Sequence, residues 1–190
     1  DTKYEYLYEY KYPTEEVPAG GVEAYGESLN RSILGYDLRI EVYGLTDNNP
    51  FFPSIKARGQ SEVSISSALA SKAGLHEGDE VILYDRIGGK AYGFTIAEVV
   101  PYSPSLACFM SIDDMRKLFN QEDDYYNIVF ADHALDIDAG RLYETVTRAD
   151  VVERSSIFVD LMGSLIVSLA GSALLILIVV MYQMMAVMID

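Results

Sequence analysis

Hydrophobic and polar residues alternate at the start of the chain, in the pattern of a half-buried β-strand. Five tyrosines occupy every second position, with mostly charged residues between them: Tyr4, Tyr6, Tyr8, Tyr10 and Tyr12. Period-two alternation places all five on one face of a strand. The same row of rings could instead form an exposed stacking surface for a ligand, and the pattern leaves both interpretations open.

The next hydrophobic segment, 27–45, predicts a short helix or turn followed by a strand. In its second half Leu38, Ile40 and Val42 alternate with charged residues, which is typical of a strand with one buried face. A polar loop interrupted by prolines, residues 46–54, closes this segment.

The central stretch "VSISSALASKAGLHEGDEVIL", residues 63–83, predicts a strand, a short helix, a tight turn and a second strand. Ser66 or Ser67 can cap the helix. Gly74 is suited to end it in the left-handed conformation, which glycine adopts without steric cost.

Glycines mark two further turns. Gly78 and Asp79 precede the strand that ends the central stretch, and Gly88 with Gly89 separates that strand from "KAYGFTIAEVV". A glycine pair between two strands predicts a hairpin with a two-residue primed turn, since such turns need positive φ. We interpret all of these as structural turn residues and not as a ligand site.

The last part of the soluble region predicts a helix, a strand and a helical approach to the C-terminus. A capping box of Ser111 and Asp114 starts "SIDDMRKLF", "DDYYNIVFAD" is expected to be the last strand, and residues 136–156 look helical. Residues 1–150 are therefore predicted to form an α+β domain with a mixed, mostly antiparallel sheet and short helices.

The C-terminal segment Leu161–Ile189 contains no charged residue over 29 positions. A helix of that length would reach about 43 Å, more than the ~30 Å of a bilayer's hydrocarbon core. We interpret it as a transmembrane helix in contact with membrane lipid, preceded by a helical stalk over 151–160. A buried core helix is the alternative.

Small residues recur on one side of this segment. They are Gly163, Ser164, Ser168, Gly171 and Ser172. Small side chains at a spacing of four residues allow a second helix to approach closely in lipid, so we expect this face to pack against another helix. The alternative is that these residues simply face lipid.

The charge of the region before the span excludes some partners. Residues 1–160 carry 28 acidic side chains, the 29 of the chain less Asp190, against 14 basic ones, a net charge of −14. Such a domain is repelled by nucleic acid and by anionic membranes, so we expect neither as its main partner.

The chain offers few residues for chemistry. Cys108 is its only cysteine, which excludes an internal disulfide, and its apolar neighbours predict a buried, inert thiol. His76 and His133 lie far apart in sequence without partners at metal-ligand spacing. We therefore expect no metal site, no cofactor and no catalytic activity in this chain.

The order of elements resembles a known family. "EVSISSALASKAGLHEGDEVIL", then "YGFTIAEVV", then "SIDDMRKLF" is similar to the extracytoplasmic domain of FtsX/MacB-type ABC transporter permeases, with "LRIEVYGLTDNNPFF" as the preceding strand. The likeness covers most of residues 36–190, and the uncharged segment falls where the second transmembrane helix of that family begins.

The resemblance implies a permease subunit in the cell membrane, with residues 1–160 extracytoplasmic and further sequence expected on both sides. Such permeases act as dimers with a separate cytoplasmic ABC ATPase, and they export peptides, confer peptide resistance or regulate cell-envelope proteins. The cytoplasmic segment that contacts the ATPase is not within these 190 residues. The alternative is a single-span, membrane-anchored binding or sensor protein.

Overall fold

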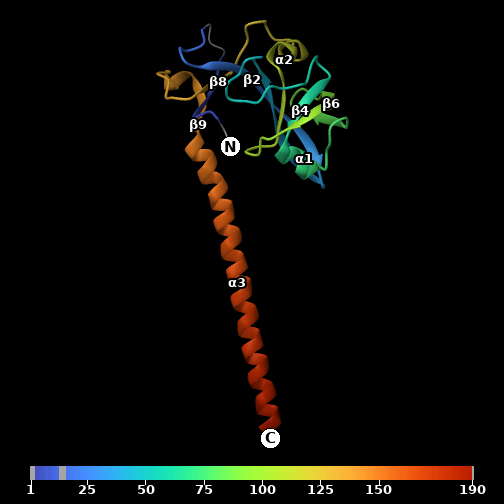
Figure 1. Cartoon of the computed structure of the whole chain (residues 1–190), viewed down its shortest axis with the longest axis vertical. Helices are drawn as coiled ribbons and strands as arrows, with labels where there is room; N and C mark the ends of the chain where they lie inside the picture. Colours follow the sequence, from blue (N-terminus) through green and yellow to red (C-terminus); the bar gives the residue numbers. More distant parts are fainter. Residues whose placement is uncertain (1–2, 13–15, 190) are drawn as a thin grey trace. The chain divides into compact units, whose positions relative to one another are not determined.

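The computed structural model describes the backbone of residues 3–12 and 16–189, and the side chains of residues 3–12, 16–151 and 165–181. The chain divides into two compact units, residues 1–148 and 149–190. The elements of the first unit (Figure 1) are β1 (Tyr6–Tyr10), β2 (Val22–Ile33), β3 (Tyr36–Leu45), β4 (Glu62–Ser66), α1 (Ser67–Ala73), β5 (Glu80–Tyr84), β6 (Ala91–Val100), β7 (Ala107–Ser111), α2 (Ile112–Leu118), β8 (Ile128–Ala131), the 3-10 helix η1 (Ala139–Arg141) and β9 (Leu142–Thr147).

Six of the strands close into a ring. The strand order is β3-β7-β4-β6-β5-β2-β8-β1-β9, and an additional β2–β3 pairing joins the first six strands into a barrel. Seven of the nine pairings are antiparallel, while β3–β7 and β4–β6 are parallel. The predicted mixed, mostly antiparallel α+β fold is confirmed, whereas closure of the ring was not predicted.

Strand β2 belongs both to the ring and to a smaller sheet beside it. Its first residues, Val22–Ala24, pair with β8, while Asn30 near its other end pairs with Tyr84 of β5. Beyond β8 the sheet continues through β1 to β9. We call β8, β1 and β9 the extension.

The apolar core follows this division. Inside the ring, α1 and α2 contribute Leu69, Ile112 and Met115 to a cluster with inward side chains of the strands. A second, aromatic cluster joins the ring to the extension. Its rings are those of Tyr4, Tyr43, Phe51, Phe52, Tyr102, Phe109 and Phe130.

The tyrosines of β1 are mostly interior, as a strand face predicts. Tyr4, Tyr8 and Tyr10 are buried, Tyr6 is half-buried, and Tyr12 beyond the strand is 75% exposed. Burial raises the pKa of Tyr10, because the phenolate would lose its hydration.

Of the short helix or turn expected before the strand of segment 27–45, the turn is present and the helix is not, because β2 continues to Ile33. Register pairs Ile33 with Tyr36, which leaves Leu34 and Gly35 as a two-residue turn with φ of 52° and 81°. Two consecutive positive φ values define a primed hairpin turn. Leucine rarely adopts this conformation, and sequence patterns therefore did not signal it.

The hairpin between β5 and β6 forms with a longer loop than two residues. Tyr84 pairs with Ala91, and the Lys90 carbonyl accepts from the Asp85 amide at 2.8 Å. Gly89 has φ of 66°, but Gly88 is not among the residues with positive φ. The primed turn expected at Gly88-Gly89 is thus replaced by a loop in which the Asp85 carboxylate accepts from the Ile87 amide at 2.8 Å.

Two expectations near the C-terminal end of the domain are also wrong. The capping box of Ser111 and Asp114 does not form, since Ser111 makes no side-chain cap bond and Asp114 instead accepts from the Gly59 amide at 2.9 Å. The region 136–147 is η1 and a ninth strand in place of a helix, so β8 is not the last strand. The open edge of β1 gives β9 a pairing partner that local sequence does not reveal.

Helix α3, Arg148–Ile189, is continuous over 42 residues. Every described side chain from 165 to 181 is exposed. Within those described residues, no helix meets the length and hydropathy of a membrane span. The side chains of the expected stalk, residues 152–160, and of positions 161–164 and 182–189 of the expected span lie outside the described set.

Candidate functional site

The turn "GLHEGDE" connects the end of α1 to the start of β5 through backbone hydrogen bonds. Gly74 has φ of 65° and ends α1, with its amide bonded to the Ala70 carbonyl. Gly78, with φ of 90°, donates to the Ile96 carbonyl at 2.8 Å. Asp79 accepts from the His76 amide at 2.8 Å, so the polar groups of this turn serve the backbone.

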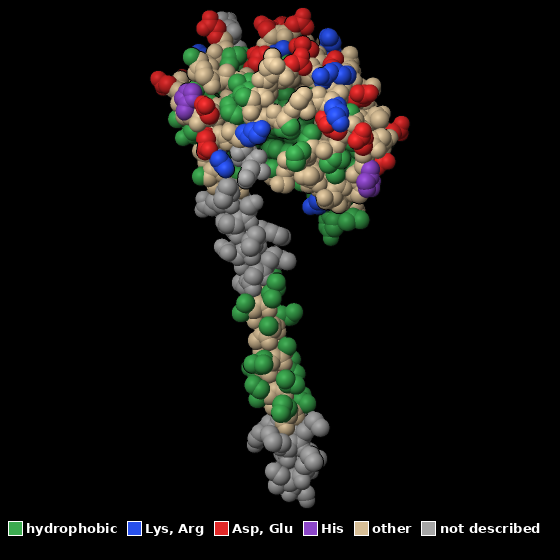
Figure 2. Space-filling view, viewed as in Figure 1, with side chains coloured by type: hydrophobic (Ala, Val, Ile, Leu, Met, Phe, Trp, Pro, Cys, Tyr) green, Lys and Arg blue, Asp and Glu red, His purple; other side chains and the backbone are tan. Residues whose placement is uncertain are grey.

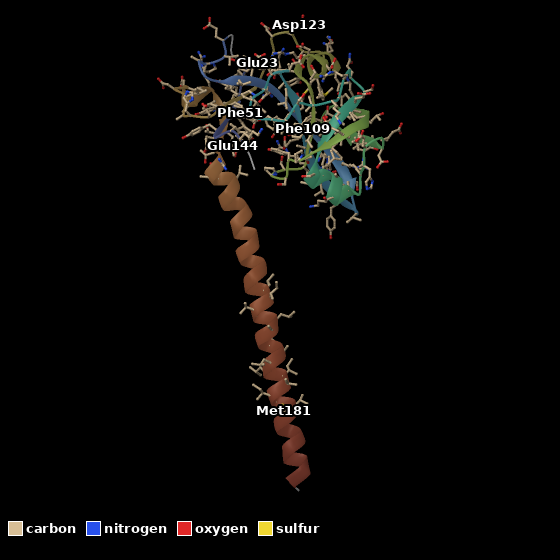
Figure 3. All side chains as sticks on the ribbon, in the orientation of Figure 1. Glu23, Phe51, Phe109, Asp123, Glu144 and Met181 are labelled. Atoms are coloured by element: carbon tan, nitrogen blue, oxygen red, sulfur yellow. The ribbon has the colours of Figure 1, made fainter. Side chains whose placement is uncertain are left out.

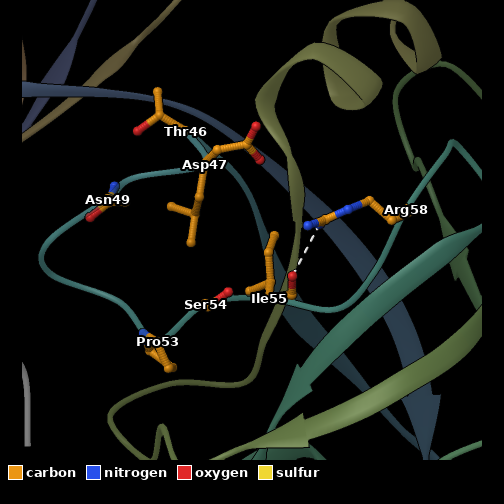
Figure 4. Close-up of a pocket in the computed structure, with 8 residues that line it drawn as sticks. Thr46, Asp47, Asn49, Pro53, Ser54, Ile55 and Arg58 are labelled. Carbon is orange, nitrogen blue, oxygen red and sulfur yellow. Dashed lines mark hydrogen bonds between the residues drawn. The ribbon is translucent and has the colours of Figure 1, made fainter.

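The loop between β3 and β4 encloses a small hollow (Figure 4). Its lining includes Asp47, Asn49 and Arg58, and its volume is about 100 Å³. Small-molecule sites usually enclose roughly 300–1,000 Å³. Arg58 donates to the carbonyls of Ile55 and Ala57 at 3.0 and 2.9 Å, so its guanidinium fixes the loop, and the hollow is smaller than a usual small-molecule site.

The titratable residues singled out in the sequence lie apart. Cys108 is fully buried in β7, and burial raises the pKa of its thiol to about 12. The side chain of His76 is 82% exposed, and His133 is hydrogen-bonded to Asp132, whose pKa it lowers. Among the described residues, no group of three or more His, Cys, Asp or Glu side chains could hold a metal ion.

The arrangement with the clearest functional meaning is the pairing of the first and last strands of the domain. β1 and β9 are antiparallel neighbours, with Tyr6 opposite Thr147 and Glu9 opposite Glu144. The start of β1 therefore lies beside the end of β9, where α3 begins at Arg148. The chain enters and leaves the domain at one place (Figure 1).

Two contacts fasten this junction. The Arg148 amide donates to the Glu5 carbonyl at 2.9 Å, and Arg148 Nη1 lies 3.1 Å from Glu5 Oε1. Both side chains are nearly half exposed, so the ion pair contributes at most about 1 kcal/mol to stability. The ion pair holds the residue that follows β9 beside the residue that precedes β1.

An acidic pair lies on the extension near the junction. Burial raises the pKa of Glu9, and Glu41 and Glu144 raise it further while Arg39 lowers it. Figure 2 shows acidic side chains distributed over the visible face of the domain. The opposed Glu9 and Glu144 concentrate that charge on two paired strands.

The residues expected to pack against another helix lie on α3. Ser168, Gly171 and Ser172 have described side chains, and the Ser172 hydroxyl donates to the Ser168 carbonyl at 2.8 Å. Gly163 and Ser164 lie within the helix, outside the residues with described side chains. The small-residue face remains a prediction.

Comparisons with known proteins return a distant structural likeness. No protein-family model and no curated protein matches the chain. A solved structure described as the extracellular domain of a noncanonic ABC-type transporter, YknZ, from Gram-positive bacteria aligns at 14% identity with a TM-score of 0.42, covering 73% of this chain and 85% of that one. A likeness this distant identifies neither the fold nor the function of the chain.

Sequence reasoning missed the junction residues Glu5 and Arg148 and the strand that joins them. A signal was present, since "LYETVT" at 142–147 is rich in β-branched and aromatic residues. It was outweighed by the neighbouring "DIDAGR" and "RADVVERSS", which read as helical. Only the partner strand β1 decides the conformation of this segment.

Proposed function

We propose that this chain is the external domain and the second membrane helix of an ABC transporter permease subunit of the FtsX/MacB type. In this role it couples ATP hydrolysis by a cytoplasmic partner subunit to substrate export, peptide resistance or regulation of a cell-envelope protein. A second permease copy completes the transporter. The domain carries no covalent chemistry, and hydrolysis takes place in the ATPase.

The pairing of β1 with β9 is the observation that carries this proposal. A domain inserted between two membrane helices must receive and return the chain at one place, and antiparallel terminal strands do so. The chain also passes from β9 into α3 without a linker, since Thr147 ends the strand and Arg148 begins the helix. A movement of the helix would thus be applied directly to a paired strand.

The character of α3 supports its assignment to the bilayer. Leu165, Ile166 and Val167 are 64%, 66% and 73% exposed, and because consecutive residues of a helix lie about 100° apart, these apolar side chains face three different sides of it. A helix that is apolar all round needs an apolar surrounding. The uncharged 29 residues of Leu161–Ile189 are long enough to provide a span.

Thiol labelling in sealed vesicles tests the span. We expect a cysteine at Tyr12, on the exposed part of the domain, to react with a membrane-impermeant maleimide, and a cysteine at Ile176 to stay unreactive until the membrane is dissolved and the protein denatured. The buried native Cys108 should contribute no background. Labelling of Ile176→Cys in intact vesicles at the rate of Tyr12→Cys would contradict the span.

Co-purification tests the function itself. The full-length protein should recover an ABC ATPase, and its ATP hydrolysis should change when the permease is present. Arg148→Ala should weaken that coupling while leaving ATPase binding intact. The matched control is Arg86→Ala, which removes an exposed ion pair with Asp37 at 2.8 Å in the ring. Failure to recover any ATPase would favour the single-span sensor.

A further inference from the structure

Strand β2 has a stretch without a strand partner on one side. Residues Val22–Ala24 pair with β8 and Asn30 pairs with β5, so among the described pairings residues 25–29 have a strand neighbour only in β3. The side chain of Asn127 bonds to this stretch instead, because its Oδ1 accepts from the Gly26 amide at 2.7 Å and its Nδ2 donates to the Gly26 carbonyl at 2.8 Å. The wall of the ring is therefore incomplete beside residues 25–29.

Glu27 lies on the core-facing side of this stretch. Residues two apart on a strand share a face, and its neighbours Tyr25 and Leu29 are buried members of the apolar cluster inside the ring. Glu27 Oε1 accepts from the Tyr25 hydroxyl at 2.6 Å. No described lysine or arginine forms an ion pair with Glu27, and no described hydrogen bond uses its Oε2. The half-buried carboxylate thus keeps its charge and an available acceptor oxygen beside apolar side chains.

Four aromatic rings form a connected group that includes the ring of Tyr25. Its centroid lies 4.9 Å from that of Tyr125 and 6.0 Å from that of Phe119, and the Phe119 and Tyr92 centroids are 5.1 Å apart. Tyr92, Phe119 and Tyr125 are half-buried, so solvent reaches all three. Burial is the main cause of the raised pKa values of Tyr92 and Tyr125, and the charge of Glu27 raises both further. The carboxylate is therefore close enough to both rings to act on them.

A buried arginine holds the loop that follows α2. Arg116 donates to the Tyr125 carbonyl at 2.7 Å, and its guanidinium pairs with Glu23 and Asp113 at 3.3 and 3.2 Å. Figure 3 labels Glu23 on β2 and Asp123 in this loop. The Tyr125 ring is thus held in position, while the charge of Arg116 is balanced by carboxylates other than Glu27.

We propose that Glu27 and the rings of Tyr25, Tyr92, Phe119 and Tyr125, which we call the Glu27 site, bind a lysine side chain of another polypeptide. The lysine ammonium group donates to Glu27 Oε2, and its methylene groups lie against the half-buried rings. Aromatic faces attract cations within about 6 Å of the ring centroid. The net charge of −14 on residues 1–160 also attracts a cationic segment from a distance.

The hydrogen bond from Tyr25 favours lysine over other cations. Arginine pairs best with both oxygens of a carboxylate at once, but Glu27 Oε1 already accepts from the Tyr25 hydroxyl. A quaternary ammonium group has no N–H to donate to Oε2. A lysine ammonium group is a compact charge with three donors, so a single acceptor oxygen is enough to bind it.

The inference deepens the proposed function, on which its biological role rests, by naming the group that the external domain recognises. The binding test needs no ATPase, so the two can fail separately. The probe is a fluorescent, blocked pentapeptide, Gly-Ser-Lys-Ser-Gly, titrated into the purified full chain in detergent and followed by fluorescence anisotropy. Salt at roughly 0.15 M screens the attraction between distant charges.

Three peptides of the same length define the ligand. Norleucine in place of lysine removes the charge and should abolish binding. Arginine should bind more weakly than lysine, and trimethyl-lysine about tenfold more weakly, because it cannot donate a hydrogen bond to the carboxylate. Binding of either cation as tight as that of lysine would overturn the assignment of a lysine site.

A pair of glutamate variants places the site at Glu27. Glu27→Gln keeps an acceptor for the Tyr25 hydroxyl and should lower peptide affinity about tenfold. Glu77→Gln, at an exposed position of the turn between α1 and β5, removes the same charge and should leave affinity unchanged. Unaltered binding by Glu27→Gln would overturn the proposal. Equal losses in the two variants would also overturn it, because net charge alone would then explain binding.

A second pair of variants tests the aromatic part of the site. Tyr92→Phe keeps the ring and should bind the peptide as the native protein does. Tyr92→Leu removes the attraction between ring and cation and should lower affinity about threefold, with urea unfolding as the check that both variants are folded. Equal losses in the two variants, or no loss in either, would show that the ring does not contact the ligand and would overturn the proposal.

Discussion

The ring and the extension are both built of β-strands, but they differ in how those strands are paired. In the ring every strand has at least two neighbours, and α1 and α2 contribute side chains to the same apolar cluster as the strands. The extension ends at β9, which has one neighbour and an exposed outer edge. Closure protects backbone groups from other chains, whereas an open strand leaves them exposed, so the two regions differ in how completely their strands are paired.

The largest expected difference between the two regions is in how much stability each loses when one side chain is shortened to alanine. Ile65→Ala, at a fully buried position of β4 inside the ring, should lower the free energy of unfolding by about 3 kcal/mol. Tyr143→Ala on the edge of β9 should change it by less than about 0.5 kcal/mol. Urea unfolding of both variants checks this, and equal losses would show that the edge is packed.

Substitutions in the turn after α1 should show that the stability of the ring depends on the backbone geometry of this turn and not on its polar side chains. Gly74→Val forces a β-branched residue into φ of 65°, at a cost of about 2 kcal/mol in unfolding free energy. His76→Ala, two residues later, is the matched control and should leave both stability and any transport activity unchanged. Loss of transport by a folded His76→Ala protein would assign the turn a chemical role.

The contact between Glu5 and Arg148 should contribute little to the stability of the first unit. Arg148→Ala removes a half-exposed ion pair with Glu5 and should lower the unfolding free energy by at most about 1 kcal/mol. The contribution should shrink as salt is added, because exposed charges are screened. A salt-independent loss of several kcal/mol would indicate that α3 supports the fold of the extension.

The smallest expected change is a gain in stability from a substitution in the turn between β2 and β3. Leu34 is 88% exposed and has φ of 52°, so its side chain contributes little packing while its backbone is strained. Leu34→Asn should raise the unfolding free energy by about 0.5 kcal/mol, because asparagine tolerates this conformation. Leu34→Ala keeps the strain and should not raise the free energy of unfolding. Equal thermal midpoints for the two variants would contradict a strained backbone at this position.

Local patterns were informative where the decisive interactions lie close in sequence. Alternating tyrosines predicted β1, and a serine followed by small apolar residues predicted α1, whose Ser66 hydroxyl accepts from the Leu69 amide at 3.2 Å. Gly74 was expected to end that helix, and it lies there with positive φ. In each case the signal and the structure it produces fall within one or two turns of chain.

Patterns were misleading where a distant strand or amide decides the outcome. Asp114 was expected to complete a cap but bonds to Gly59, 55 residues away. Segment 142–147 was read as helical, yet pairing with residues 6–10 makes it a strand. Leu34 occupies a turn conformation that leucine disfavours, because the long β2–β3 ladder on either side fixes its register.

The sequence alone determined the class of fold, the acidity of the domain and the presence of a long uncharged segment after it, since these depend on composition and short-range periodicity. Tertiary structure decided that the strands close into a ring, that β1 and β9 are neighbours, and that one edge stays open. The extension depends on pairings between residues more than a hundred positions apart, and closure of the ring depends on pairings as distant as Glu41 with Ala107. Backbone hydrogen bonds form between any two strands of suitable geometry, so such pairings leave little trace in the residues themselves.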